Sequence, residues 1–164
     1  MEEKKILFKI RIISAIFIVC LLVSGLTAFP LLHELNVLCK MMNIDPVVDP
    51  NNYEGLQHWI SMVRSGLDHT YSKYPFIAYG TDWLAFAHIV ISIFFVGVLI
   101  NPRKNIWIVH SGVIACVGVI FIAMICGAIR GIPFYWRLID SSFGIIGLIP
   151  LIWSLRLINR IERL

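Results

Sequence analysis

Arg137 and Asp140 stand three residues apart within residues 130–150, a stretch that is otherwise mostly apolar and aromatic. On a helix, that spacing puts both charges on one face, where the arginine and the aspartate can pair. An arginine can also hold a phosphate or a carboxylate. Because charges are costly in an apolar helix, the first hypothesis for these two residues is a functional one.

His88 is the second group with chemical potential, because it follows Asp82 by six residues at the start of another apolar stretch. A histidine can act as a general base or a metal ligand, and an acid can orient it. Three further candidates stand where apolar stretches end: His33, Glu34 and Arg130. These seven side chains are the candidate binding residues, and no catalytic role is assigned to any of them.

The elements that must position these residues follow from the composition. Of the 164 residues, 59% are hydrophobic and 15% are charged, against roughly 25% charged residues in soluble domains. Because so few charges cannot cover the surface of a soluble protein, we expect lipid to surround much of the chain. No basic run with interleaved aromatic residues is present, so no nucleic-acid partner is expected.

Four apolar runs are long enough to cross about 30 Å of hydrocarbon as helices. They span residues 12–32, 83–100, 106–129 and 134–155. The first run exceeds the roughly 7–15 residues of a signal-peptide core, so we expect it to remain uncleaved. The predicted fold class is all-α: a polytopic membrane protein in which residues 1–164 form a single domain, a bundle of four transmembrane helices.

The distribution of lysine and arginine predicts the orientation. Nine of the 14 basic residues fall before the first run, in the turn after the second run, or after the last run. With four helices these segments share one side, which the positive-inside rule assigns to the cytoplasm. We therefore expect a multi-pass protein of the cell (inner) membrane with both termini cytoplasmic.

The 33–81 loop is then the one sizeable segment on the outer side. Residues 43–52 contain two Asp-Pro steps, which indicate a turn-rich linker. Apolar residues then recur at helical spacing, and this predicts a short amphipathic helix on the outer membrane surface or over the bundle. These residues are Leu56, Trp59, Ile60, Val63 and Leu67.

The depths of the candidates suggest that they meet. If the fourth helix begins at Pro133, Asp140 lies about 10 Å along its axis, and His88 lies about 9 Å below Asp82. Both depths fall in the outer leaflet, and Arg130 ends the third helix on the same side. The sequence therefore predicts an outward-facing polar pocket of histidine, aspartate, glutamate and arginine.

Each candidate also has a purely structural interpretation. Thr81 or Asp82 can cap the second helix, and Asp140 can cap the fourth if that helix begins there. Arg130 can extend to lipid headgroups. Arg137 and Asp140 can be a structural pair that fixes helix packing.

No cofactor and no metal are expected. His110 lies roughly 12 Å below His88, so these two histidines cannot share one haem or one zinc ion. His33, Glu34, Asp82 and His88 are the one zinc set that the sequence offers, and their different depths argue against it. The chain has no CxxC pair, which argues against thiol-redox chemistry.

Three classes of function fit this sequence, and we favour the first. It is a binding or accessory role of a small membrane protein toward a lipid headgroup, a small solute or a partner subunit. The second is a membrane-embedded enzyme that acts on a lipid-linked substrate at the outer leaflet. The third is a subunit of an oligomeric transporter or channel. The expected partners are the lipid bilayer, a headgroup or solute at the outer face, and a homo- or hetero-oligomeric neighbour.

Overall fold

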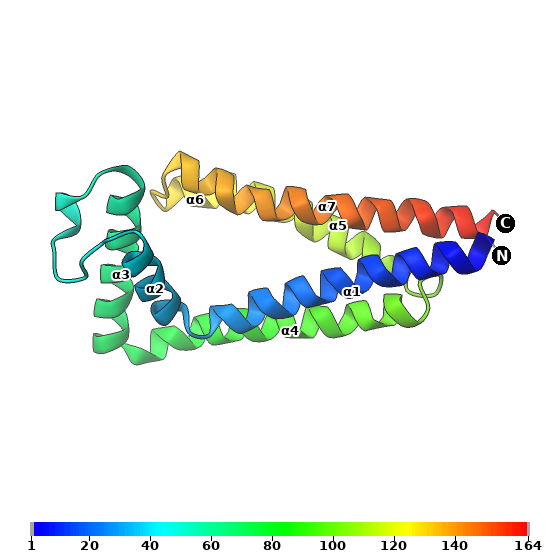
Figure 1. Ribbon diagram of the computed structural model, residues 1–164, viewed down its shortest axis with the longest axis horizontal. Coiled ribbons are helices and arrows are strands. Elements are labelled where there is room, and N and C mark those ends of the chain that lie inside the picture. The colour runs from blue at the N-terminus through cyan, green and yellow to red at the C-terminus, as the bar shows by residue number, and fades with distance from the viewer. Residues whose placement is uncertain (1, 164) are drawn as a thin grey trace. The chain divides into compact units, whose positions relative to one another are not determined.

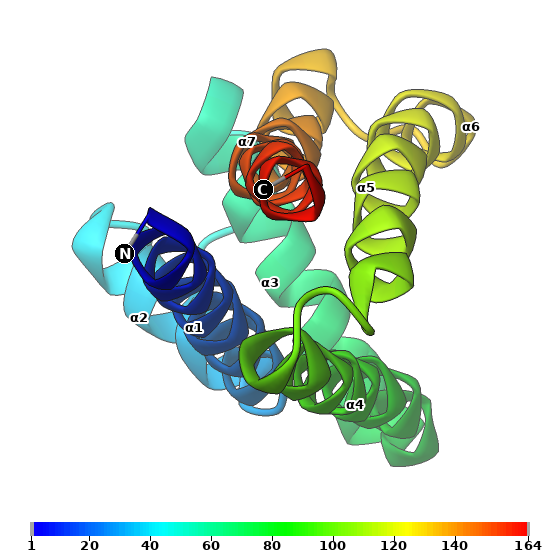
Figure 2. The same cartoon turned by 90° about the vertical axis from the view of Figure 1, so that its right-hand side faces the viewer.

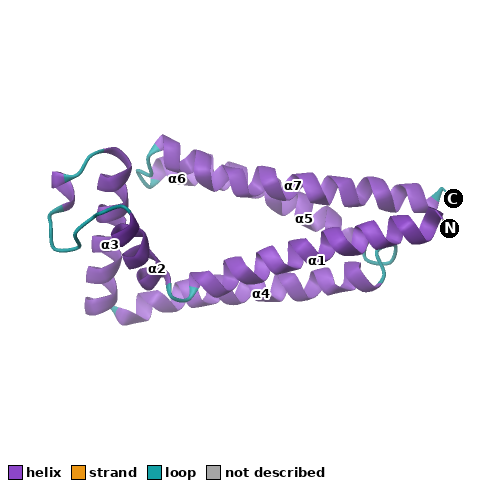
Figure 3. Ribbon diagram, viewed as in Figure 1, coloured by secondary structure: helices purple, strands orange, loops and turns teal. Residues whose placement is uncertain are grey.

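The computed structural model describes residues 2–163, and every regular element among them is a helix (Figures 1 and 3). Four helical segments are long and apolar enough to cross a membrane: Glu2–Ala28, Pro75–Ile100, Ile106–Ile129 and Phe134–Glu162. The all-α class and the four apolar helices predicted from the sequence are confirmed. The third segment coincides with its predicted run, whereas the other three begin or end outside theirs, because polar residues continue these helices.

The contacts divide the described chain into two compact units. One unit comprises residues 2–21 and 90–163, and we call it the α5–α7 unit; the other comprises residues 22–89, and we call it the α2–α3 unit. Helices α1 (Glu2–Ala28) and α4 (Ala78–Ile100) contribute residues to both units.

The α5–α7 unit is organised around two antiparallel helical stretches that lie side by side in both views (Figures 1 and 2). The first stretch consists of α5 (Ile106–Phe121), the π-helical segment η3 (Ile122–Cys126) and α6 (Gly127–Ile129). The second is α7 (Phe134–Glu162). The core of this unit is formed by Ile6, Ile10, Phe95, Val98, Val109, Leu151, Ile158 and Ile161.

The turn before α7 sets where that helix begins. Gly131 adopts a positive φ of 71°, a conformation that glycine accepts without steric cost. Pro133 follows in an extended conformation at the N-cap position, where a proline costs no helical hydrogen bond. α7 therefore begins at Phe134, and Asp140 lies in its interior, about 9 Å along the axis from Phe134.

In the α2–α3 unit, the prediction that the first apolar helix continues to residue 32 is wrong. α1 ends at Ala28, and a new helix, α2 (Leu31–Met41), begins after Pro30. Pro30 has no N–H for a helical bond, and it also disfavours the α conformation at Phe29. Residues 33–41, predicted as part of the loop, are therefore helical.

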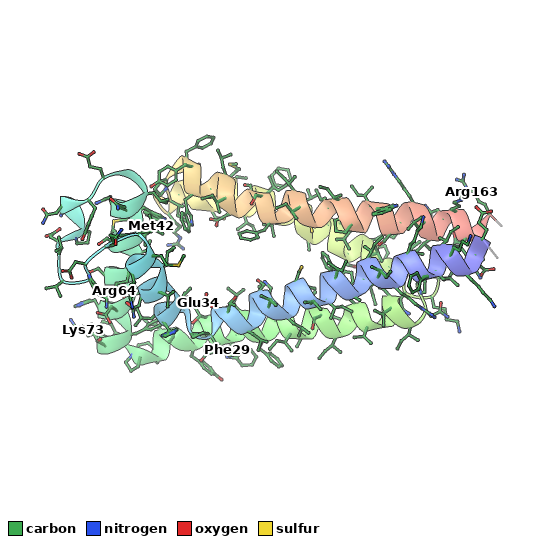
Figure 4. The ribbon with its side chains drawn as sticks, in the orientation of Figure 1. Phe29, Glu34, Met42, Arg64, Lys73 and Arg163 are labelled. Carbon is green, nitrogen blue, oxygen red and sulfur yellow. The ribbon has the colours of Figure 1, made fainter. Side chains whose placement is uncertain are left out.

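The rest of this unit consists of η1 (Pro50–Asn52), α3 (Gly55–Lys73) and η2 (Pro75–Ile77). α3 occupies the segment for which a helix was predicted. Figure 4 labels Arg64 on α3 and Glu34 on α2, and the two helices are joined by a hydrogen bond from Arg64 Nε to Asn36 Oδ1 of 2.8 Å. Cys39, Ile44 and Ile60 are buried in this unit.

Candidate functional site

α7 packs into its unit through positions that are spaced alternately by three and four residues. Its buried positions are separated by three, seven, three, four and three residues: Ser141, Gly144, Leu151, Ser154, Ile158 and Ile161. This spacing keeps one face of a helix against its neighbours, as in coiled coils. We call this row of positions the α7 seam.

Arg137 and Asp140 extend the α7 seam toward the start of the helix. Asp140 precedes Gly144 by four residues and follows Arg137 by three, and both charged side chains are half-buried. They therefore share the face that packs against α5, which is where ionisable residues of membrane helices are usually found. The apolar residue beside them, Ile139, is 43% exposed.

Close approaches fix the register between α7 and the antiparallel stretch that faces it. A Cβ atom at Gly112 would lie 3.0 Å from Leu151 Cδ1, and one at Gly144 would overlap the carbonyl oxygen of Cys116. At the other end, a Cβ atom at Gly127 would lie 2.8 Å from Arg137 Cδ. Asp140 lies between Arg137 and Gly144 on the seam, so it comes opposite the chain between Cys116 and Gly127, which includes the π-helical segment.

The guanidinium group of Arg137 has one nitrogen that forms a hydrogen bond and another that has no partner. Its Nη1 donates to the carbonyl oxygen of Met124 in the π-helical segment, at 3.3 Å. Its guanidinium carbon lies 5.3 Å from the centroid of the Phe134 ring, within the range of a cation–π interaction. Its Nε is buried and has no hydrogen-bond partner, although buried donors are almost always paired.

The expected pairing of Arg137 with Asp140 is not formed. The ion pairs among residues 2–163 are Arg64–Asp68, Arg103–Glu3 and Arg160–Glu2. The Arg137 side chain passes over Gly127 toward the Met124 carbonyl instead, which directs its charge across to the neighbouring segment. The alternative that Asp140 is an N-cap is also wrong, because α7 begins six residues earlier.

Ser141 adds a third polar group that sequence reasoning missed. It is 3% exposed, and its Oγ has no hydrogen-bond partner. Arg137 and Ser141 are four residues apart, so they lie on the same side of α7. The signal was present as a serine directly after the aspartate in the same apolar run.

Arg130, the remaining candidate of this unit, is exposed at the C-cap of α6. Its exposure agrees with the interpretation that it extends to lipid headgroups. Its membership of a binding site stays a prediction.

His88 lies in the α2–α3 unit, half-buried on α4. Its Nδ1 is 2.9 Å from the carbonyl oxygen of Leu84, and since a carbonyl only accepts, Nδ1 carries the proton. In the neutral form of the ring, Nε2 is then the nitrogen that accepts. Across from it, a Cβ atom at Gly25 would lie 3.0 Å from His88 Cβ, so α1 and α4 approach closely at this level.

The other candidates of the α2–α3 unit lie within helices: Asp82 on α4, and His33 and Glu34 on α2. α4 begins at Ala78 rather than near residue 83, so the prediction that Thr81 or Asp82 caps it is wrong. Thr81 Oγ1 instead donates to the Ala78 carbonyl oxygen at 2.6 Å. His33 and Glu34 are exposed on α2.

The described chain brings no three histidine, cysteine, aspartate or glutamate side chains close enough together to hold a metal ion. This finding removes the zinc set of His33, Glu34, Asp82 and His88. The seven candidates divide between the two units, three in one and four in the other, and their meeting in one pocket stays a prediction.

Comparison with known proteins adds no assignment: the chain matches no protein-family model, no curated protein and no solved structure. The residues themselves are then the evidence for function. The strongest set is Arg137, Asp140 and Ser141, which we call the polar end of the α7 seam.

Proposed function

We propose that this chain is a small integral membrane protein whose polar end of the α7 seam binds a polar headgroup or small polar solute. The observation that carries the proposal is unused hydrogen-bonding capacity. Arg137 Nε and Ser141 Oγ are buried without partners, and the Asp140 carboxylate makes no ion pair within the described chain. A ligand that supplies these partners would offset the cost of burying them.

The π-helical segment supports this proposal. Such segments interrupt the regular α-helical bonding, and they occur frequently at functional sites. Here the segment supplies the Met124 carbonyl to Arg137, and it lies in the part of the chain that comes opposite Asp140. An arginine held from behind by a carbonyl is oriented before a ligand arrives, which reduces the entropic cost of binding.

The proposed location is the non-cytoplasmic side of a bacterial inner membrane. The basic residues at both ends of the chain and in the turn after Ile100 support cytoplasmic termini. With four crossings in a bundle, the start of α7 then lies near the outer surface. In this arrangement α3 (Gly55–Lys73) lies on the outer membrane surface or over the bundle, as an amphipathic helix would.

A membrane-embedded enzyme acting on a lipid-linked substrate is the second candidate. The observation that favours it is the hydrogen bond from His88 Nδ1 to the Leu84 carbonyl oxygen, which in a neutral ring leaves Nε2 to act as a general base. In this case His88→Gln would abolish turnover of a lipid-linked substrate while leaving binding at Arg137 intact.

Thermal unfolding of the purified protein in detergent tests the first proposal. Inorganic phosphate, glycerol 3-phosphate and phosphoethanolamine are added in turn to wild type, Arg137→Gln and Asp140→Asn. Arg156→Gln and Glu162→Gln are the matched controls, since both residues are exposed on the same helix. Stabilisation of wild type and of the controls by at least one compound, lost in Arg137→Gln and altered in Asp140→Asn, supports the proposal. Equal responses in all five proteins, or no response to any compound, contradict it.

A further inference from the structure

We infer that the ligand of this site is a zwitterion that joins a phosphate to a primary ammonium group, the chemistry of a phosphoethanolamine headgroup. This inference rests on the proposed function, because it names the class of compound that the polar end of the α7 seam would bind. It follows from the charges, the hydrogen-bonding groups and the position of one aromatic ring.

The charges of the site favour a zwitterion over an anion. Arg137 and Asp140 bring one positive and one negative charge to the same half-buried face, and no ion pair joins them. Burying a charge without a counter-charge is strongly unfavourable. A zwitterion that places its phosphate at Arg137 and its cationic group at Asp140 compensates both charges. A purely anionic ligand would leave Asp140 uncompensated and would add a like charge beside it.

The hydrogen-bonding groups make the same distinction. Arg137 Nε is a free donor, and a guanidinium forms its strongest hydrogen bonds with phosphate or carboxylate oxygens. An ionised carboxylate only accepts, so Asp140 requires a ligand that donates. A primary ammonium carries three N–H donors, whereas the quaternary ammonium of a choline headgroup carries none.

The aromatic ring nearest to Arg137 argues against choline as well. Proteins bind quaternary ammonium groups by surrounding them with aromatic faces. The Phe134 ring is already covered by the guanidinium of Arg137, 5.3 Å from its centroid. The arginine therefore occupies one face of this ring, and the single remaining face does not make the aromatic cage that a choline group requires.

A membrane lipid and a free small molecule could both present this chemistry, so the test separates them. The full-length protein is placed in phosphatidylcholine nanodiscs alone, or doped with phosphatidylethanolamine or phosphatidylglycerol. Bound lipid is then counted by native mass spectrometry after release. Soluble phosphoethanolamine and inorganic phosphate are added as competitors in parallel samples.

For wild type we expect phosphatidylethanolamine to be retained over phosphatidylcholine by about tenfold, the effect of one charge-assisted hydrogen bond. Binding of phosphoethanolamine by a protein that retains none of the lipids would assign the site to the soluble form of the same zwitterion. Asp140→Asn should remove the preference over phosphatidylcholine but keep phosphate binding. Arg137→Gln should remove binding of all these compounds, while Arg137→Lys should keep part of it, which separates loss of the site from loss of folding.

Two outcomes overturn the inference in different ways. Equal retention of all three lipids by wild type, lost in Arg137→Gln and unchanged in Asp140→Asn, contradicts zwitterion recognition but leaves a phosphate-binding site. If Arg137→Gln and Asp140→Asn both bind every compound as wild type does, the proposed function fails together with the inference.

Discussion

Arg137 and Asp140 lie three residues apart on the packed face of α7, and no ion pair joins them. Pairing at this spacing is geometrically easy and would satisfy both charges. The arginine is instead fixed by the Met124 carbonyl and the Phe134 ring. Two opposite charges that stay separate on a half-buried face are the basis of the proposed binding function.

The contact of α7 with α5 depends on a glycine at 144. A Cβ atom there would overlap the backbone carbonyl oxygen of Cys116, and the backbone cannot move aside as a side chain can. We expect Gly144→Ala to destabilise the protein by about 2 kcal/mol, as overpacking in cores does. Gly118→Ala is the control, because no atom lies within 4 Å of its added Cβ. Reversible unfolding in detergent measures both; equal effects would contradict the observed register.

Gly127 should position Arg137 without contacting any ligand. The methyl group of Gly127→Ala would lie 2.8 Å from Arg137 Cδ, so the arginine must leave its place under the Met124 carbonyl. We expect the affinity for phosphoethanolamine to fall about tenfold, the loss of one charge-assisted hydrogen bond, while thermal stability changes little. Isothermal titration with phosphoethanolamine measures this change. Unaltered affinity would show that the observed Arg137 conformation is not the one that binds.

Arg64 should be the main polar link between α2 and α3. Its Nε donates to Asn36 Oδ1 at 2.8 Å, and its Nη1 lies 3.4 Å from Asp68 Oδ2. Arg64→Lys removes the Nε donor, and we expect a loss of about 1–2 kcal/mol. Faster proteolysis within residues 42–54 would report it, with Lys40→Gln on exposed α2 surface as the control. A double-mutant cycle with Asn36→Ala should give a coupling energy clearly different from zero.

Cys39 should make stability depend on pH in the alkaline range. Burial raises the pKa of its thiol, and the nearby Arg64 charge lowers it by less. The thiol of the unfolded chain ionises first, near pH 8.5. The stability that the buried, neutral thiol contributes is therefore complete below that pH and is lost as the pH rises above it. The slope can reach about 1.4 kcal/mol per pH unit. Between pH 7 and 9.5, the free energy of unfolding should fall more steeply with pH for wild type than for Cys39→Ala. Parallel curves would exclude ionisation of Cys39 as the cause.

The four long helices could be predicted because each apolar run has about the length that a helix needs to cross the hydrocarbon. α2 was missed although Leu31, Leu35 and Leu38 recur at helical spacing, since Pro30 was placed inside the preceding helix instead of between two helices. The α7 seam was also visible as alternating steps of three and four residues. The π-helical segment could not be predicted, because it depends on how Met124 and its neighbours pack against α7.

The direction of the Arg137 side chain shows the same limit. Spacing alone placed Arg137 and Asp140 on one face, and the structure agrees. Which partner the guanidinium takes depends on the space above Gly127 and on an accepting carbonyl across the interface. Neither is encoded in the spacing of residues along one helix.

Thiol labelling at adjacent positions of α7 tests most directly whether its polar end is a water-accessible site. Asp140→Cys and Ile139→Cys are compared in a background without Cys20, Cys39, Cys116 and Cys126, using a charged, membrane-impermeant methanethiosulfonate. Position 140 should react from the non-cytoplasmic side and be protected by inorganic phosphate, which Arg137 still binds, while position 139 should remain unlabelled in lipid. Labelling of position 140 from the cytoplasm only, its complete inertness, or equal reaction at both positions would contradict a binding site at the polar end of the α7 seam.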